Sequence, residues 1–398
     1  MPVAILPSSP PDASGGGSVG ATETFWVKGK DRIALVTASP EDGPSTLGMK
    51  IQRKIRLKDV AELAGVAVNT ASTILNRRPN SWASKETEAR VFKAANELGY
   101  RPSKTARALQ SGRYHSIGLL IQDLTNPFFS TLADELEAAV EERGYDLIVE
   151  NCRSSLVRER HLFNDLSDLE VDGMVVWLSD NSAFEEDLAA SFKGPLPFVA
   201  LGCGSSSLPI PVDSVVSNFT EGLQQAVDAM YELGHRQYAF LSALAEGQAD
   251  GSRPDLMTRM LAEKGVPASS ITILRSSHSI DSACETVTTF LKSAGGNRPT
   301  ALFAINDLSA MGAMRAAIEC GLSVPKDLSI VGGDDVPLAS YLPITLSSIR
   351  QRYRKITRAA ADLLIARIEG TVEDPSVPTQ IIFPTHFVAR ESVGPAAH

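Results

Sequence analysis

From residue 116 onward, the sequence alternates between short apolar runs and amphipathic stretches. Runs such as SIGLLI, DGMVVWL and PFVALG are separated by stretches such as STLADELEAAVEERG, and the alternation returns with QYAFLSA, ALFAIN and LSIVGG. Near-continuous apolar strands between helices indicate parallel sheets that are covered by helices on both faces. About nine or ten such strands exceed one comfortable sheet, so we predict two doubly wound lobes with a cleft between them.

A basic module precedes this α/β region. Residues 50–113 carry 14 basic and 5 acidic side chains, whereas the whole chain has a net charge of −9. A basic module on an acidic body indicates that a polyanion binds the module alone. A solvated basic face is the structural alternative.

Helical periodicity fills residues 57–100 of the basic module. KDVAELAGV and GVAVNTASTILN are typical of two short helices joined by AGVA, and SKETEARVFKAANELGY predicts a third helix between Ser84 and Gly99. Two short helices with a tight turn are a helix-turn-helix signature, whose second helix places its first residues against bases in the major groove. An ordinary three-helix bundle has the same periodicity. The apolar face of the first helix is expected to comprise Val60, Ala61, Leu63 and Ala64.

The N-terminal segment, the cysteines and the lengths of the apolar runs indicate the cellular compartment of the protein. The first 48 residues are rich in Gly, Ser and Pro, and Met49 is a second candidate translation start. The four cysteines show no paired spacing, no apolar run has the length of a membrane span, and the N-terminus lacks the features of a secretory signal. We expect a reduced, cytoplasmic protein without a membrane partner, a metal or a cofactor.

Several longer motifs follow one another in order. They are LKDVAELAGVAVNTASTILN, ETEARVFKAANELGYRPSKTARALQSG and SIGLLIQDLTNPFF, and later LGHRQYAFLS, AINDLSAMGAMRAAIECGLSVPKDLSIVGGDD and LSSIRQ. Over residues 57–392 the chain resembles the lactose-repressor (LacI/GalR) family of transcriptional regulators. The resemblance implies an N-terminal all-α helix-turn-helix head and an α/β, two-lobed core like that of periplasmic binding proteins. It also implies a homodimer that binds a palindromic double-stranded operator.

The motifs set the expected domain boundaries. We place a disordered tail at residues 1–50, the helix-turn-helix domain at 51–101, a hinge helix and linker at 102–114, and the effector-binding core at 115–392. The expected N-lobe comprises residues 115–217 and 348–370, and the expected C-lobe comprises 218–347 and 371–392.

The resemblance implies DNA contacts from the second helix and from the hinge helix. Asn69 is suited to a bidentate contact with adenine, and Val68 and Thr73 are suited to thymine methyl groups. Leu109 would wedge into the minor groove at the central base step. The expected DNA-binding residues are Val68, Asn69, Thr70, Ser72, Thr73, Arg77, Lys104, Arg107 and Leu109.

The head departs from the family at three places. Ala67 stands where a Ser usually caps the second helix, a loss of about 1 kcal/mol. Asn69 could cap instead, but its amide would then not be free for a base. Thr73 replaces a long side chain such as Arg. The loop NRRPNSWASKET is about two residues longer than usual, and its Trp82 is expected to anchor in the core.

The resemblance also implies an effector between the two lobes. Arg253 and Asp334 would together clamp vicinal hydroxyls or a charged group. The alternatives are structural: a strand-to-helix turn at Asn126, a surface position for Arg253, and an exposed loop for His278. The expected effector-binding residues are Asn126, Phe128, Arg253, His278, Asn306 and Asp334.

Two substitutions and two neighbouring carboxylates refine this site. Gly333 stands where the family usually has Phe or Tyr, and His278 falls near a position that often stacks an aromatic ring on the ligand. We therefore expect a roomier, less aromatic pocket, which favours an oligosaccharide or a sugar acid over a purine. Asp307 is expected to cap the helix that follows it, and Asp335 to be a cap or a surface group.

We expect a repressor of carbohydrate-utilisation genes in which lobe closure on a sugar-like effector reorganises the hinge helices. One alternative is a solute-binding receptor without a DNA role, which would need a signal peptide and no basic head. Another is a co-repressor-type regulator with a non-sugar ligand. No GxGxxG, P-loop, GxSxG or HExxH motif occurs, which argues against an enzyme. The heptad tail of the family's tetramers is missing, so a dimer is expected.

Overall fold

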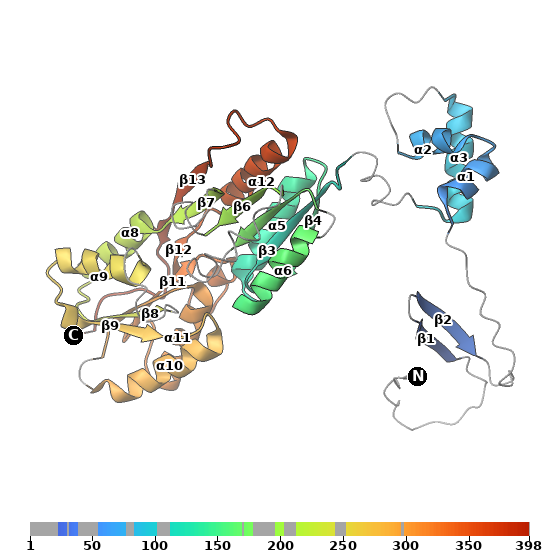
Figure 1. Ribbon diagram of the computed structural model, residues 1–398. Coiled ribbons are helices and arrows are strands. Elements are labelled where there is room, and N and C mark those ends of the chain that lie inside the picture. The colour runs from blue at the N-terminus through green and yellow to red at the C-terminus, as the bar shows by residue number, and fades with distance from the viewer. Residues whose placement is uncertain are drawn as a thin grey trace, which may run out of the picture. The chain divides into compact units, whose positions relative to one another are not determined.

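The computed structural model describes residues 23–29, 32–38, 55–76, 83–101, 112–168, 171–177, 196–202, 212–242, 252–295 and 298–397. They belong to two compact units, Met1–Pro102 and Ser103–His398 (Figure 1). Helices of the first unit and the sheets of the second unit each surround their own clusters of buried apolar side chains.

Two paired strands occur near the N-terminus. β1 (Glu23–Gly29) runs antiparallel to β2 (Arg32–Ala38), with Glu23 opposite Ala38 and Gly29 opposite Arg32. Both segments, ETFWVKG and RIALVTA, contain the β-branched and aromatic residues that favour strands. The expectation of a disordered tail over residues 1–50 is therefore wrong for these two segments.

The three expected helices of the head are present as α1 (Leu57–Ala64), α2 (Val68–Leu75) and α3 (Lys85–Leu98). α1 ends at Gly65, whose φ of 64° is in the left-handed region that glycine adopts without strain. The Oγ atom of Ser84 accepts a hydrogen bond from the N–H of Thr87 (3.2 Å) and caps α3. The buried side chains come from all three helices and are Val60, Ala61, Ala64, Ala71, Ile74, Val91, Ala94 and Ala95.

One expected core residue of the head is exposed. Leu63 leaves 52% of its surface accessible, so the inner stripe of α1 is limited to the positions of Val60, Ala61 and Ala64. These three positions are one and three residues apart, which keeps them on one side of a helix. Leu63 lies at the edge of that stripe.

The N-lobe contains a six-stranded parallel sheet in the order β13-β7-β6-β5-β3-β4. Its strands are β3 (Ser116–Ile121), β4 (Asp146–Asn151), β5 (Gly173–Trp177), β6 (Phe198–Leu201), β7 (Asp213–Asn218) and β13 (Gln380–Pro384). Its helices are α5 (Pro127–Glu141), α6 (Leu156–Asp168) and α12 (Tyr353–Glu369).

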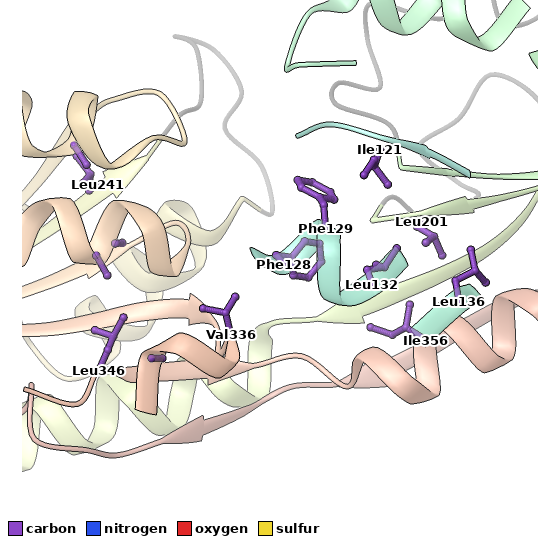
Figure 2. Close-up of a cluster of buried hydrophobic side chains, with 14 of the residues drawn as sticks. Ile121, Phe128, Phe129, Leu132, Leu136, Leu201, Leu241, Val336, Leu346 and Ile356 are labelled. Carbon is purple, nitrogen blue, oxygen red and sulfur yellow. The ribbon is translucent and has the colours of Figure 1, made fainter. Parts of the chain in front are cut away.

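Alternate side chains of the N-lobe strands enter two different clusters. Ile117 and Leu119 of β3 pack with α5 and α12, whereas Leu120 packs with Phe163 and Leu166 of α6. This alternation covers both faces of a parallel sheet. Figure 2 shows part of the first cluster, with Phe128, Phe129, Leu132 and Leu136 from α5 and Ile356 from α12.

The C-lobe repeats this plan with the sheet order β14-β12-β11-β10-β8-β9, in which only β14 is antiparallel to its neighbour. Its strands are β8 (Tyr238–Ser242), β9 (Ile271–Arg275), β10 (Ala301–Ala304), β11 (Ser329–Asp334), β12 (Ser347–Arg350) and β14 (His386–Val388). Its helices are α8 (Thr220–Glu232), α9 (Arg253–Glu263), α10 (Ile280–Ser293) and α11 (Asp307–Glu319), with short 3₁₀ turns at Ala268–Ser270 and Pro337–Ser340.

The chain passes between the lobes three times, and this corrects two expected boundaries. The crossings lie between β7 and α8, between β12 and α12, and between β13 and β14. β13 joins the N-lobe because Gln380–Pro384 pairs with β7, although residues 371–392 were expected in the C-lobe. β12 pairs with β11 and keeps residues 348–350 in the C-lobe. The prediction of two doubly wound lobes is confirmed.

Candidate DNA-binding head and effector site

Helix α2 presents a polar stripe beside a buried one. Val68 and Asn69 are exposed and Thr73 is partly exposed, whereas Ala71 and Ile74 face the core of the head. The predicted contact residues of this helix therefore share an accessible surface; they are Val68, Asn69, Thr70, Ser72 and Thr73. The other predicted DNA-binding residues, Arg77, Lys104, Arg107 and Leu109, lie outside the described residues, as does Trp82.

The first turn of α2 lacks a side-chain cap. Ala67 is the N-cap residue and makes no side-chain hydrogen bond. The side chain of Asn69 makes no hydrogen bond within the described part of the head, so its amide remains available for a base edge. The Thr73 hydroxyl donates to the Asn69 carbonyl oxygen (2.9 Å), which leaves the Thr73 methyl as its outward group.

In the N-lobe, two predicted effector residues have structural partners. Asn126 is the N-cap of α5, and its Oδ1 atom accepts a hydrogen bond from the N–H of Phe128 (3.0 Å). The Phe128 ring is 2% exposed and contacts the rings of Trp177 and Tyr353 at centroid distances of 4.9 and 5.4 Å. The structure thus supports the strand-to-helix turn at Asn126 and makes Phe128 a packing residue.

Arg253 is the first residue of α9, at the carboxyl edge of the C-lobe sheet. Its Nη1 atom donates to the carbonyl oxygen of Ile305 (2.5 Å), and its guanidinium carbon lies 4.3 Å from the centroid of the Phe219 ring. Desolvation lowers the pKa of Arg253, and the negative charge of Asp334 opposes that change. Arg253 is therefore a cation held on an aromatic face and a carbonyl, not a solvated surface group.

His278 and Asn306 lie next to each other near Arg253. The Nδ2 atom of Asn306 is 3.4 Å from both Nδ1 and the carbonyl oxygen of His278. Its Oδ1 atom accepts the N–H of Ser309 (2.8 Å), which makes Asn306 the N-cap of α11. Desolvation, followed by the charge of Arg253, lowers the pKa of His278.

Asp334 terminates β11 with its carboxylate buried. The Nε2 atom of Gln351 donates to Asp334 Oδ1 (2.7 Å), and the hydroxyl of Tyr353 donates to the Asp334 carbonyl oxygen (2.7 Å). Desolvation raises the pKa of Asp334 to about 7, against the opposing effects of Arg253 and the Gln351 hydrogen bond. Burial likewise raises the pKa of Tyr353, so its hydroxyl stays protonated as a donor.

Asp307 and Asp335 hold loops in place, and neither has the role that the sequence predicted for it. Asp307 accepts hydrogen bonds from Ser348 Oγ (2.5 Å) and from the N–H of Val336 (2.7 Å), while Asn306 rather than Asp307 caps α11. Asp335 is buried and pairs with Arg350 and with Arg390 Nη2 (2.6 Å), so it is neither a cap nor a surface group. Burial and the charge of Asp334 raise the pKa of Asp307.

Gln351 and Tyr353, which follow β12, were not among the predicted site residues. Gln351 and Tyr353 connect Asp334 to the second crossing between the lobes. A signal for them was the polar run RQR (residues 350–352) directly after the buried residues Ser347, Ser348 and Ile349. Tyr353 also opens α12, whose Arg354 and Arg358 pair with Glu135 (3.1 Å) and Glu142 (2.9 Å) near α5.

Comparison with known proteins fits this architecture. Residues 56–103 match the bacterial regulatory proteins of the lacI family, and residues 227–393 match the periplasmic binding protein-like domain. A transcriptional repressor named PurR from Photobacterium profundum is 31% identical over 313 residues, which cover 79% of this chain and 92% of the relative. The chain belongs to the lacI family. A PurR repressor from Vibrio parahaemolyticus is 32% identical and covers 81% of this chain and 94% of the relative.

Solved structures of transcriptional regulators share the fold. A lac repressor dimer bound to operator and the anti-inducer ONPF matches with a TM-score of 0.72 at 24% identity, over 86% of this chain and 100% of that chain. The regulator CelR in complex with cellobiose matches with a TM-score of 0.60 at 25% identity, over 85% and 99%. This member of the lacI family is a DNA-binding transcriptional repressor, and its relatives are repressors rather than enzymes.

Two absences concern the residues that the structure describes. No group of three or more His, Cys, Asp or Glu side chains there is arranged to hold a metal ion. Within the same residues, every helix is too short or too polar to cross a membrane.

Proposed function

We propose that this repressor binds a palindromic operator as a cytoplasmic homodimer and responds to a small polar effector bound between its lobes. Asn69 and the methyl groups of Val68 and Thr73 would read bases in the major groove. The hinge residues Lys104 and Arg107 would contact phosphates and Leu109 would enter the minor groove. The accessible, uncapped first turn of α2 supports the DNA-reading role of this helix.

The observation that carries the effector proposal is the arrangement at the carboxyl edge of the C-lobe sheet. Arg253, His278, Asn306 and Asp334 follow four neighbouring strands, β8, β9, β10 and β11. Ligands of open α/β sheets bind outside the carboxyl ends of the strands. Carboxylate, amide and guanidinium groups at this edge would bind the hydroxyls of a sugar, and solved relatives at 25% and 26% identity hold cellobiose and ribose.

A purine-related effector is the second candidate. The curated relatives at 31% and 32% identity are named PurR repressors, and aromatic rings lie close to the site, with Phe219 beneath Arg253. A purine would need a stacking face in addition to polar partners. With a sugar effector the repressor would control carbohydrate-utilisation genes, and with a purine effector it would control purine-related genes.

Selection from random double-stranded DNA with the full-length chain tests the regulator role. We expect enrichment of one palindromic sequence, followed by a change in its affinity when candidate sugars or hypoxanthine are added. The Asn69→Ala variant should lose the enriched sequence but retain salt-dependent binding to other DNA. Enrichment of no sequence, or of a sequence without two-fold symmetry, would contradict the proposal.

A further inference from the structure

Among the described residues Arg253 has no acidic partner, unlike the partly buried Arg367 and Arg390. In the described part of the chain, no carboxylate oxygen lies within 4.0 Å of its guanidinium. By contrast, Arg390 pairs with Asp335 (2.6 Å) and Arg367 pairs with Asp213 (2.7 Å). A desolvated cation without a compensating anion is unfavourable, so it is rarely retained for stability alone.

Asp334, in turn, has no cationic partner among the described residues. Its carboxylate receives the amide of Gln351, and no Lys, Arg or His nitrogen among the described residues lies within 4.0 Å of it. Arg253 and Asp334 interact electrostatically across a distance that is too long for an ion pair. A molecule that offers an anion to Arg253 and a hydroxyl donor to Asp334 would satisfy both groups.

His278 and Asn306 add N–H donors beside the guanidinium of Arg253. Asn306 directly follows Ile305, whose carbonyl oxygen holds Arg253, and its Nδ2 group lies 3.4 Å from the His278 ring. His278 is exposed as a residue, yet desolvation and the charge of Arg253 lower the pKa of its imidazole, so the ring is neutral and offers one N–H donor. It can therefore turn toward an incoming anion and add a second, charge-assisted hydrogen bond.

Gly333 allows Arg253 to occupy its position. A Cβ atom at Gly333 would lie 2.8 Å from the Ile305 carbonyl oxygen and 3.3 Å from Nη1 of Arg253. The expectation that Gly333 makes the pocket roomier is therefore wrong, because Arg253 and the main chain of Ile305 fill the space beside it. Without a side chain at residue 333, the guanidinium can lie against the end of the sheet.

We propose that Arg253, His278 and Asn306 bind an anionic group of the effector, while Asp334 accepts a hydroxyl of the same molecule. A sugar that carries a carboxylate has this chemistry. The inference rests on the proposed effector site and narrows its ligand class. The inference depends chiefly on Arg253, which has no acidic partner among the described residues.

Calorimetric titration of the full-length protein tests the charge requirement. The probes are D-glucuronate and D-galacturonate, each compared with its neutral hexose, D-glucose or D-galactose. We expect at least one uronate to bind about tenfold or more tightly than its hexose, as a charged hydrogen bond allows. Arg253→Met should abolish this preference, whereas Arg315→Met, which removes an exposed arginine paired with Glu319, should retain it.

Two additional variants keep the test decisive if Arg253→Met folds poorly. Arg253→Lys preserves the charge and should keep a reduced preference for the uronate, and His278→Gln should weaken uronate binding several-fold and more than it weakens binding of the neutral hexose. Tighter binding of a hexose or of hypoxanthine than of both uronates would overturn the inference, as would failure of both uronates to bind. Operator binding is measured on the same preparations, so its loss would indicate failure of the proposed function instead.

Discussion

Gln351 contacts Asp334 twice: its side-chain amide donates to the carboxylate (2.7 Å) and its main-chain N–H to the carbonyl oxygen (3.3 Å). Tyr353 donates to that same carbonyl, and its ring packs on Phe128 at the start of α5. The residue proposed to bind the effector is thus bonded to the segment that joins the lobes. An effector bound to Asp334 would act directly on this crossing, which is the kind of hinge that closes two-lobed proteins.

Replacing Asp334 by Asn should make stability less sensitive to pH. The pKa of Asp334 is raised to about 7 in the folded protein, above the value of about 3.9 in an unfolded chain. The folded protein therefore holds the proton more tightly, and the stability that this group contributes below pH ~4 is lost as the pH rises through ~7. Asn stays neutral, so we expect Asp334→Asn to exceed the wild type by up to about 4 kcal/mol at pH 8.

Denaturant unfolding at several pH values, followed by fluorescence, measures this difference. The gap between the variant and the wild type should close toward pH 4. Asp307 also has a raised pKa, partly because of the charge of Asp334, so Asp334→Asn relieves this repulsion too and the change in Asp307 adds to the difference at high pH. A gap that stays constant between pH 5 and pH 8 would show that Asp334 does not titrate in this range.

Gly332→Ala should destabilise the C-lobe. A Cβ atom there would lie 2.2 Å from Oδ1 of Asp307, which must then leave its hydrogen bonds to Ser348 and Val336. We expect a loss of about 1–3 kcal/mol in thermal or denaturant unfolding, typical of an overpacked core. Gly394→Ala is the comparison, because its Cβ would contact a Pro325 ring atom at 3.1 Å, and its effect should be smaller. Equal losses would argue against the Asp307 contact as the cause.

Ala67→Ser should strengthen the head. Ala67 is the N-cap of α2 without a side-chain hydrogen bond, and a serine hydroxyl at this position can accept the free N–H groups of the first turn. We expect a gain of about 0.5–1 kcal/mol, seen as slower hydrogen exchange of the α2 amides and tighter operator binding. Ala67→Val offers no acceptor at the N-cap and should give no such gain, and an equal response of both variants would exclude capping.

Asn69 and Thr73 should respond differently to replacement. Asn69→Ala should cost about 1–3 kcal/mol on the preferred operator and little on DNA altered at the contacted base pair. Thr73→Val keeps the outward methyl and removes a hydroxyl that is already bonded to the Asn69 carbonyl, so operator affinity should change little. Fluorescence anisotropy titrations at a fixed salt concentration measure both. A large loss for Thr73→Val would mean that the hydroxyl, not the methyl, contacts DNA.

The sequence predicted the architecture well because its strongest signals are local. Apolar runs between amphipathic stretches indicated parallel sheets, and the positions of Ser84, Gly65 and Gly99 marked helix ends that the structure confirms. The lobe boundaries were less accurate. Whether QIIFP pairs in one lobe or the other depends on the free edge of β7, more than 150 residues earlier in the chain, and no local pattern reveals it.

The sequence predicted which residues form the candidate site better than it predicted what each residue does there. The motifs grouped Arg253, His278, Asn306 and Asp334 as candidate effector residues, and in the structure they lie at or after the ends of four neighbouring strands. The functions of Asn306, Asp335 and Gly333 depend on distances across the fold, such as the approach of Arg253 to residue 333, and residue types alone do not specify these distances. Gln351 and Tyr353 were missed because their partner is the end of another strand.

The three passages between the lobes also affect the order in which the protein can be completed during synthesis. The N-lobe needs α12 to cover its sheet and β13 to close its edge beside β7, and both follow nearly the whole C-lobe in the sequence. A ribosome therefore releases most of the C-lobe before the first lobe can acquire its last strand. Until then, the edge of β7 and the apolar face that α12 will cover stay open to non-native pairing, so the unfinished N-lobe is the part of the growing chain most exposed to misassembly.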